Sequence, residues 1–197
     1  ATGVGGATME EMASNGLVDG ILDLTLHELT SEYFGGGFSY GPKASTRLVK
    51  SVDKKVPLVI SLGGLDFVDF STSELPERMD ERKHMLHNAN TAHIKILPGE
   101  AEALGKVLTD RLSKVTYPVK LLIPTKGMRH NTKAGEELYS PETDNVLIQT
   151  IVDNVNDNVE VILIPHNLDT KEFGNKAAHY IIQEMKQRGT LPEDFTY

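Results

Sequence analysis

The chain of 197 residues contains no cysteine. This absence excludes a disulfide framework, a zinc site built on thiolates and a catalytic cysteine. No stretch approaches the roughly 20 consecutive apolar residues that a membrane-spanning helix requires, and the first residues lack the layout of a signal peptide. We therefore expect a cytoplasmic protein that does not contact a membrane.

Basic residues are fewer than acidic ones: 20 Lys and Arg stand against 28 Asp and Glu, for a net charge of −8. A surface of this sign repels phosphate backbones at long range, so nucleic-acid binding through a broad basic face is disfavoured. A local basic pocket remains compatible with the composition. The length predicts one α/β domain over residues 1–197, large enough to bury a substantial core.

Several catalytic motifs are also missing. His27-Glu28 lacks the second histidine of a zinc-protease helix, and no GxSxG nucleophile motif occurs. His84, His87 and His93 are close in sequence, but their spacing is not a known metal-ligand pattern. We predict neither acyl-transfer hydrolysis of the Ser-His-Asp type nor a metal site.

Apolar runs alternate with helical patterns along most of the chain. Strands are predicted at 18–25, 56–62, 119–124 and 159–164, and helices at 7–13, 26–33, 46–52, 99–115, 141–155 and 173–188, whereas 65–97 is less regular. Continuous Val, Ile and Leu strands followed by amphipathic helices indicate a mainly parallel sheet with helices on both faces. The fold class is α/β and Rossmann-like, and its first strand is expected to be missing because none precedes the opening glycine turn.

The loops after the predicted strands hold the candidate ligand contacts, because parallel sheets bind ligands where their strands end. Asp66 follows one strand and can orient a hydroxyl, a magnesium-bound water or a base, or simply cap the next turn. Lys126 follows another and can neutralise a phosphate or carboxylate, or lie solvated. His87 and Asn88 can donate hydrogen bonds to a phosphoryl oxygen.

Two glycine-rich segments supply further candidates. Gly3, Gly5 and Gly6 precede a predicted helix, where backbone N–H groups and the positive helix end can bind phosphate. An ordinary tight turn explains these glycines equally well. A second loop, which includes Gly36, Gly37 and Ser39, is able to close over a ligand or to serve as a flexible connection.

Six segments, taken in order, resemble one known family: Thr2-Gly3-Val4-Gly5-Gly6, residues 19–25, residues 36–42, Gly64-Leu65-Asp66, His87-Asn88 and residues 123–127. The chain resembles, over nearly its whole length, the C-terminal half of the ATP-binding domain of the tomato mosaic virus resistance protein family. Two departures from the family pattern occur: Ala89 stands where proline is usual, and Arg129-His130 where apolar or small residues are commoner.

The resemblance implies a protein of two Rossmann-like halves, of which this chain is the C-terminal one. It also implies nucleotide binding for the family, without showing which half carries the adenine. We expect ATP, with magnesium, or another phosphorylated metabolite to be held between this half and an N-terminal half of the same protein, and we expect a homo-oligomer. The residues assigned to the ligand in this interpretation are Gly3, Gly5, Gly6, Gly36, Gly37, Ser39, Asp66, His87, Asn88 and Lys126.

Three functions remain open at this point. The first is a half-domain that binds a nucleotide or another phosphorylated metabolite, with phosphoryl transfer or ATP-driven ligation as the chemistry if there is turnover. The second is a non-catalytic regulatory or protein-interaction module whose surface is set by ligand occupancy. The third is an enzyme acting on sugar or carboxylate substrates without a nucleotide. No catalytic residue is assigned.

Overall fold

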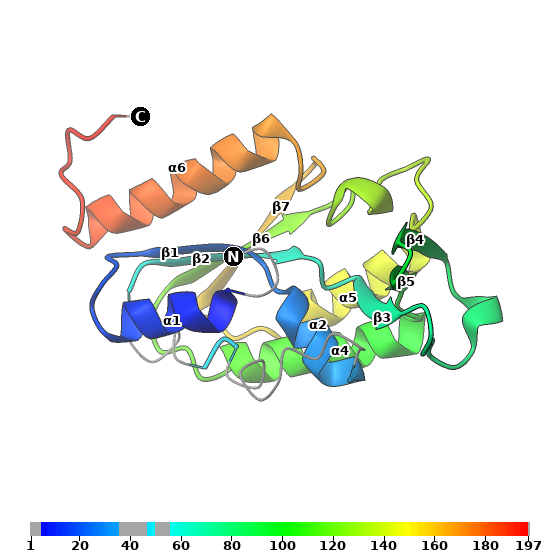
Figure 1. Cartoon of the computed structure of the whole chain (residues 1–197). Helices are drawn as coiled ribbons and strands as arrows, with labels where there is room; N and C mark the ends of the chain where they lie inside the picture. The colour runs from blue at the N-terminus through cyan, green and yellow to red at the C-terminus, as the bar shows by residue number, and fades with distance from the viewer. Residues whose placement is uncertain (1–4, 36–46, 50–55, 197) are drawn as a thin grey trace.

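Four parallel strands form the central sheet in the computed structural model, which describes residues 5–35, 47–49 and 56–196 (Figure 1). The strands are β1 (Ile21–Thr25), β2 (Leu58–Gly63), β6 (Val119–Pro124) and β7 (Val159–Ile164). They pair in the order β1-β2-β6-β7, and every pairing is parallel. The prediction of an α/β fold built on a mainly parallel sheet is therefore confirmed.

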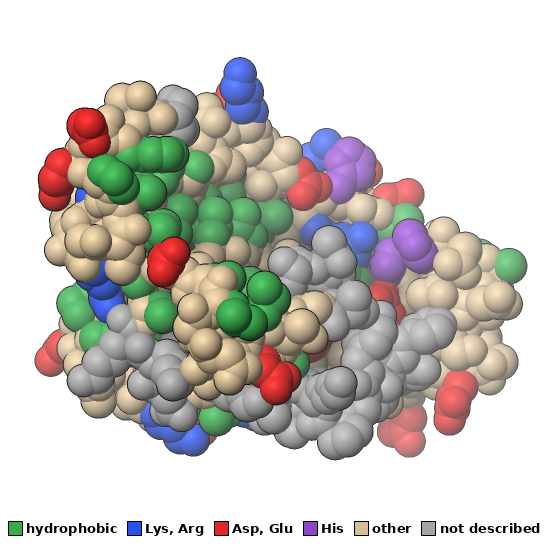
Figure 2. All heavy atoms as spheres, turned by 60° about the vertical axis from the view of Figure 1, so that its left-hand side comes forward, with side chains coloured by type: hydrophobic (Ala, Val, Ile, Leu, Met, Phe, Trp, Pro, Cys, Tyr) green, Lys and Arg blue, Asp and Glu red, His purple; other side chains and the backbone are tan. Residues whose placement is uncertain are grey.

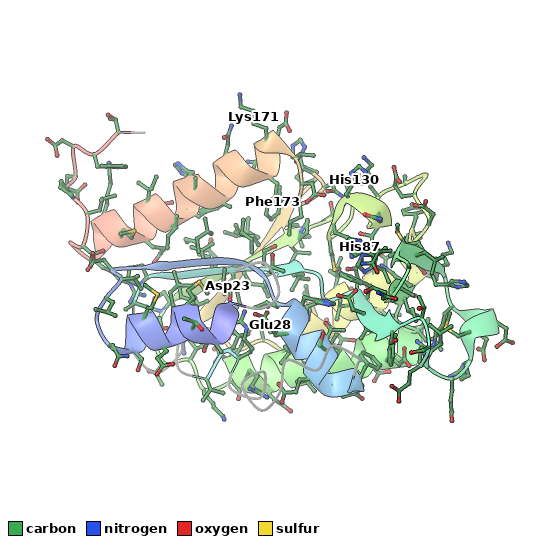
Figure 3. All side chains as sticks on the ribbon, in the orientation of Figure 1. Asp23, Glu28, His87, His130, Lys171 and Phe173 are labelled. Atoms are coloured by element: carbon green, nitrogen blue, oxygen red, sulfur yellow. The ribbon has the colours of Figure 1, made fainter. Side chains whose placement is uncertain are left out.

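Helices cover both faces of this sheet (Figure 1). Helices α1 (Gly6–Ser14), α2 (His27–Phe34), α4 (Pro98–Leu112) and α5 (Pro141–Asn154) lie on one face. Helix α6 (Lys171–Gln187) lies on the other, and Phe173 points from it toward the sheet (Figure 3). Thr170 caps α6, since its side chain accepts a hydrogen bond from the Phe173 N–H at 3.3 Å.

The alternation of side chains along the strands explains the continuous apolar runs in the sequence. In β2, Leu58 and Ile60 belong to the core under α1, α2, α4 and α5, whereas Val59 belongs to the core under α6. In β6, Leu121 and Leu122 divide in the same way. Full burial of such a side chain contributes about 1.5–3 kcal/mol, so both layers are held by the same strands.

A second, antiparallel sheet was missed by the sequence analysis, which described residues 65–97 as less regular. Its strands are β3 (Phe67–Ser71), β4 (His84–Asn88) and β5 (Thr91–Lys95), in the order β3-β5-β4, and the single turn η2 (Met79–Glu81) lies between β3 and β4. One face carries the small apolar cluster of Val68, Ala92 and Ile94. Asp69 pairs with His93 on the other face, and this polar face hid the strand pattern.

Other expected elements agree with the structure to within a few residues, with one exception. Residues 47–49, part of the helix expected at 46–52, form a turn, and the rest of that segment lies outside the described residues. No strand precedes α1 among the described residues. None of the helices in the described part of the chain combines the length and the apolar character that crossing a membrane requires.

The face of the molecule beside α6 is hollowed. Figure 2 shows hydrophobic side chains gathered in this hollow, and histidine, basic and acidic side chains gathered at the opposite end of the same view. The partly buried residues around the α6 core are Leu22, Leu24, Ile162, Leu168, Tyr180, Ile182 and Met185.

Candidate functional site

A cavity of about 370 Å³ lies at the edge of the parallel sheet where its strands end. We call it the His–Arg cavity. Its lining combines residues at the ends of all four parallel strands with residues from one face of the small sheet. Its lining consists of Thr25, His27, Gly63, Gly64, Phe67, Asp69, His87, His93, Met128, Arg129, Leu168 and Asp169. The strand ends that parallel topology singled out therefore do converge.

Asp69 links two histidines at the floor of this cavity. Its Oδ2 lies 3.1 Å from His27 Nε2, and its Oδ1 is in hydrogen-bond contact with His93 Nδ1. The three residues come from different elements: His27 begins α2, Asp69 lies on β3 and His93 on β5. Chain segments 24 to 42 residues apart are thus held together by one carboxylate.

Both ring nitrogens of His27 face acceptors. Nδ1 lies 2.9 Å from the carbonyl oxygen of Gly64, while Nε2 faces the Asp69 carboxylate. These two contacts fix the orientation of the ring between the Gly64 turn and β3. Gly64 has φ +73°, and a Cβ there would lie 2.9 Å from the His27 Cβ, so only glycine brings this carbonyl into place.

The charge on Asp69 is strongly favoured. Burial opposes ionisation, but the hydrogen bonds that His27 and His93 make to the carboxylate outweigh it and hold the pKa of Asp69 well below its usual range. An ionised carboxylate only accepts hydrogen bonds, so His93 must donate through Nδ1. The remaining nitrogen, Nε2, is shielded from solvent and has no hydrogen-bond partner among the described residues.

Arg129 supplies the cationic group of the cavity. Its Cζ lies 3.9 Å from the centre of the Phe67 ring, a cation–π contact, and Nη1 is buried with no hydrogen-bond partner among the described residues. Burial lowers the pKa of Arg129, against the opposing charges of Asp66, Asp69 and Asp169. The guanidinium remains charged, and within the described chain no carboxylate lies within ion-pair distance of it.

A second cavity of about 550 Å³, which we call the Lys126 cavity, lies beside the first and shares Met128 with it. Asp144 lines it and contacts Lys95 Nζ at 2.6 Å, while Asp66 contacts the same Nζ at 2.7 Å. Burial and the charge of Asp66 raise the pKa of Asp144 to about 7, although Lys95 opposes the shift. Two carboxylates thus share one ammonium group, and Asp144 binds its proton more tightly than a solvent-exposed aspartate does.

Comparison with known proteins decides the family. The model of the uncharacterised protein family UPF0261 C-terminal domain matches residues 1–185. The chain belongs to this family. A UPF0261 protein of Clostridium tetani is 33% identical over 189 residues, which are 95% of this chain and 46% of that protein. The ToMV resistance protein Tm-1 of Solanum lycopersicum is 31% identical over 179 residues, 89% of this chain and 23% of that protein.

A further UPF0261 protein, from Rhizobium meliloti, is 31% identical over 180 residues, 90% of this chain and 44% of that protein. The chain therefore spans less than half the length of these UPF0261 relatives. The resemblance stated from the sequence is confirmed at the level of the family. ATP binding stays a prediction.

The structure places only some of the predicted ligand residues at the His–Arg cavity and the Lys126 cavity. His87 lines the His–Arg cavity, and Lys126 lines the neighbouring one. Asp66 is fully buried against Lys95 and lines neither cavity. Asn88 is exposed at the end of β4, where its Oδ1 accepts from the Asn90 N–H at 2.8 Å. Gly3, Gly36, Gly37 and Ser39 lie outside the described residues.

The opening glycine turn meets a carboxylate of the protein itself. The Gly6 N–H donates to Glu28 Oε1 at 2.9 Å, and the Gly5 carbonyl accepts from the Met9 N–H in the first turn of α1. Asp23 and Glu28 lie close together between β1 and the adjacent helices (Figure 3). Fully buried Arg47 pairs with both of these acids and with Glu10. A phosphate at this helix end would have to displace Glu28.

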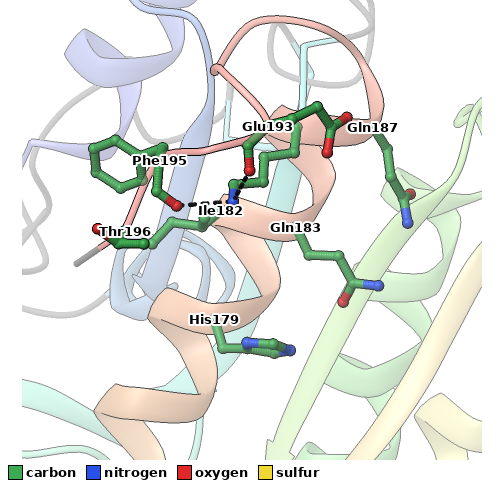
Figure 4. A pocket seen from close by; sticks show the side chains of 8 residues that line it. His179, Ile182, Gln183, Gln187, Glu193, Phe195 and Thr196 are labelled. Carbon is green, nitrogen blue, oxygen red and sulfur yellow. Dashed lines mark hydrogen bonds between the residues drawn. The ribbon is translucent and has the colours of Figure 1, made fainter.

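A third hollow, of about 480 Å³, lies against α6 and the C-terminal segment (Figure 4). Lys186 Nζ donates there to the carbonyl oxygens of Glu193 at 2.6 Å and Phe195 at 2.8 Å. Its ammonium group is thus engaged by backbone. Among the described residues no cluster of three or more His, Asp or Glu is arranged to hold a metal ion.

Five histidine or charged residues of the His–Arg cavity were not assigned to a ligand from the sequence: His27, Asp69, His93, Arg129 and Asp169. His27 and Arg129 both follow a strand of the parallel sheet within a few residues, so the strand-end rule could have selected them. Asp69 and His93 could not be selected in this way, because only the antiparallel pairing of β3 with β5 sets them opposite one another.

Proposed function

We propose that this chain binds a phosphorylated small molecule, with ATP as the candidate, in the His–Arg cavity. Arg129 carries the proposal, because its guanidinium lines the cavity while its Nη1 is buried and lacks a partner among the described residues. A half-buried guanidinium that none of the described carboxylates contacts costs free energy, and an anionic ligand that contacts it offsets that cost. The planar guanidinium matches the oxygens of a phosphate.

The surroundings of Arg129 support the same ligand. Of the two carboxylates that line the cavity, Asp69 is engaged by His27 and His93, and Asp169 is exposed. The cavity of about 370 Å³ falls within the range of about 300–1,000 Å³ that is common for small-molecule sites. It also lies at the carboxyl ends of parallel strands, where α/β sheets hold nucleotides.

The greater length of the UPF0261 relatives supports a proposal for what closes the cavity. Because UPF0261 relatives are more than twice as long as the matched segment, we propose that an N-terminal half of the same protein closes the cavity. Lys126 lies on the adjoining cavity and is placed to meet a ligand that extends past Met128.

Isothermal titration of the purified protein with ATP, with and without Mg²⁺, tests this proposal, with adenosine as the phosphate-free comparison. We expect heat with ATP and much less with adenosine. Arg129→Gln is expected to raise Kd at least about tenfold, equivalent to about 1.4 kcal/mol. Arg78→Gln is the matched control, because Arg78 is exposed and pairs with Glu81 far from the cavity lining.

Two results would overturn the proposal. One is the absence of heat with ATP from a folded sample. The other is equal affinity of the wild type and Arg129→Gln, since the unpaired guanidinium would then have no part in binding.

A further inference from the structure

We propose that Asp69 and His93 form an acid–base pair in which His93 Nε2 takes a proton from a water molecule that attacks the phosphoryl group held by Arg129. The activity assigned to the site is hydrolysis of a phosphoric anhydride or a phosphate ester. This inference rests on the proposed binding function and adds a reaction to it.

The orientation of His93 is the first support. Asp69 accepts through Oδ1, so the proton of the neutral His93 ring lies on Nδ1 and the lone pair lies on Nε2. A carboxylate that fixes the tautomer of a histidine in this way is the arrangement by which enzymes make the distal nitrogen basic. His93 is only 5% exposed, so the ring is held by its surroundings.

The missing partner of Nε2 is the second support. A buried ring nitrogen without a hydrogen bond costs roughly 1–3 kcal/mol, so folding alone does not account for it. His93 lines the same cavity as Arg129, and both present a buried nitrogen that lacks a partner among the described residues. A phosphoryl group and its attacking water satisfy an unpaired donor on Arg129 and an unpaired acceptor on His93 at once.

His87 lies beside the proposed base. The His87 ring lies 4.5 Å from the His93 ring, and His87 is exposed on β4. Both histidines line the same cavity, so His87, which the sequence analysis assigned to the ligand, is placed to contact a molecule that reaches His93.

The reaction balances without any co-reactant beyond water. The water oxygen forms a bond to phosphorus as Nε2 accepts one of its protons, and the bond from phosphorus to the leaving oxygen breaks with its electron pair on that oxygen. The His93 imidazolium, paired with Asp69, then returns the proton to the leaving oxygen. The products are ADP and inorganic phosphate from ATP, or an alcohol and inorganic phosphate from an ester.

The first test measures inorganic phosphate released by the purified protein from ATP, an anhydride, and from p-nitrophenyl phosphate, an ester. We expect release from at least one of them. His93→Gln is expected to lower the rate at least about 100-fold, as loss of a general base does, with ATP affinity changed less than about threefold. His179→Gln is the control, because His179 is exposed on α6.

The outcomes separate this inference from the binding proposal. ATP binding without release from either probe overturns the inference, leaves the binding proposal standing and supports the non-catalytic module. Unchanged release by His93→Gln also overturns the inference. Failure of ATP to bind overturns the binding proposal itself.

A second test does not depend on turnover. Nuclear magnetic resonance of the histidine ring nitrogens reports which nitrogen of His93 carries the proton. We expect Nδ1 to be protonated and Nε2 bare in the wild type, and a shift of the proton toward Nε2 in Asp69→Asn, whose amide can donate. A wild-type His93 protonated at Nε2 alone would overturn the inference even in a fully folded protein.

Discussion

The guanidinium carbon of Arg129 lies 3.9 Å from the centre of the Phe67 ring. Phe67 also stacks on His27, with ring centres 4.4 Å apart and planes 13° from parallel. One buried aromatic ring on β3 therefore positions two of the cationic groups of the His–Arg cavity. The contact explains how a long arginine side chain is held in place in the absence of a carboxylate partner.

Phe67→Leu is expected to weaken ATP binding about two- to thirtyfold, because a cation–π contact of this kind contributes about 0.5–2 kcal/mol. Isothermal titration measures the change. Phe70→Leu is the matched control, since Phe70 lies on the same strand but packs against the apolar cluster of the small sheet. An equal loss of affinity in both variants would show that the effect comes from the strand and not from the Arg129 contact.

Asp144 predicts a pH dependence of stability. Its pKa is raised from 3.8 to about 7 in the folded protein, by burial and by the charge of Asp66. The folded state then binds this proton more tightly than the unfolded chain does, so the associated stability is complete below about pH 4 and is lost as the pH rises through 7.

Urea denaturation at several pH values between 4 and 8 measures this effect against Asp144→Asn, which cannot titrate. We expect the free energy of unfolding of the wild type to fall relative to the variant by on the order of 4 kcal/mol across that range. A difference that stays constant with pH would contradict the assignment.

Arg47 predicts a large loss of stability. Its side chain is fully buried and pairs with Asp23 at 2.6 Å, with Glu28 at 3.3 Å and with Glu10. Arg47→Met removes the shared cation and leaves the acids without it, so the free energy of unfolding should fall by about 3–5 kcal/mol. Lys106→Ala, which breaks an exposed pair with Glu102, should cost no more than about 0.5 kcal/mol. Comparable losses of unfolding free energy in both variants would contradict the prediction that the buried ion cluster contributes more than an exposed pair does.

Gly64 predicts a backbone effect next to the cavity. Gly64→Ala places a Cβ at a residue with φ +73° and 2.9 Å from the His27 Cβ, so we expect a loss of more than about 1 kcal/mol. Gly174→Ala, inside α6 with open space around it, should instead stabilise the protein by about 0.5–1 kcal/mol. Thermal unfolding compares the two variants, and a shift of the same sign in both would contradict the argument.

The parallel sheet could be predicted from sequence because β2 and β6 are covered on both faces. Their apolar runs, 58–63 and 119–124, are each interrupted by a single polar residue, Ser61 and Lys120, and are easy to recognise. The strands of the small sheet could not be recognised in this way. His93 and Lys95 lie buried within β5, where burial depends on partners from distant segments, and no local pattern reveals such partners.

The candidate site shows the same division. Its location followed from the topology of parallel strands, and Lys126 was found near it for that reason, whereas His87 was assigned for its hydrogen-bonding chemistry. Asp66 was assigned to the ligand because it follows β2, yet Lys95, 29 residues away, holds it in the interior. Ion pairs between distant elements decide which strand-end residues face a cavity. Such pairs cannot be predicted from the local sequence pattern, because the partners are far apart in the chain.

The central claim is that Arg129 and His93 receive the phosphoryl group of a ligand. An experimental structure of the purified protein with ATP tests it most directly. We predict a phosphate oxygen within hydrogen-bond distance of the Arg129 guanidinium, on the side of the cavity that His93 lines. ATP bound with its phosphates at Lys126 or at the Gly6 turn, and with Arg129 still unpaired, would contradict the account.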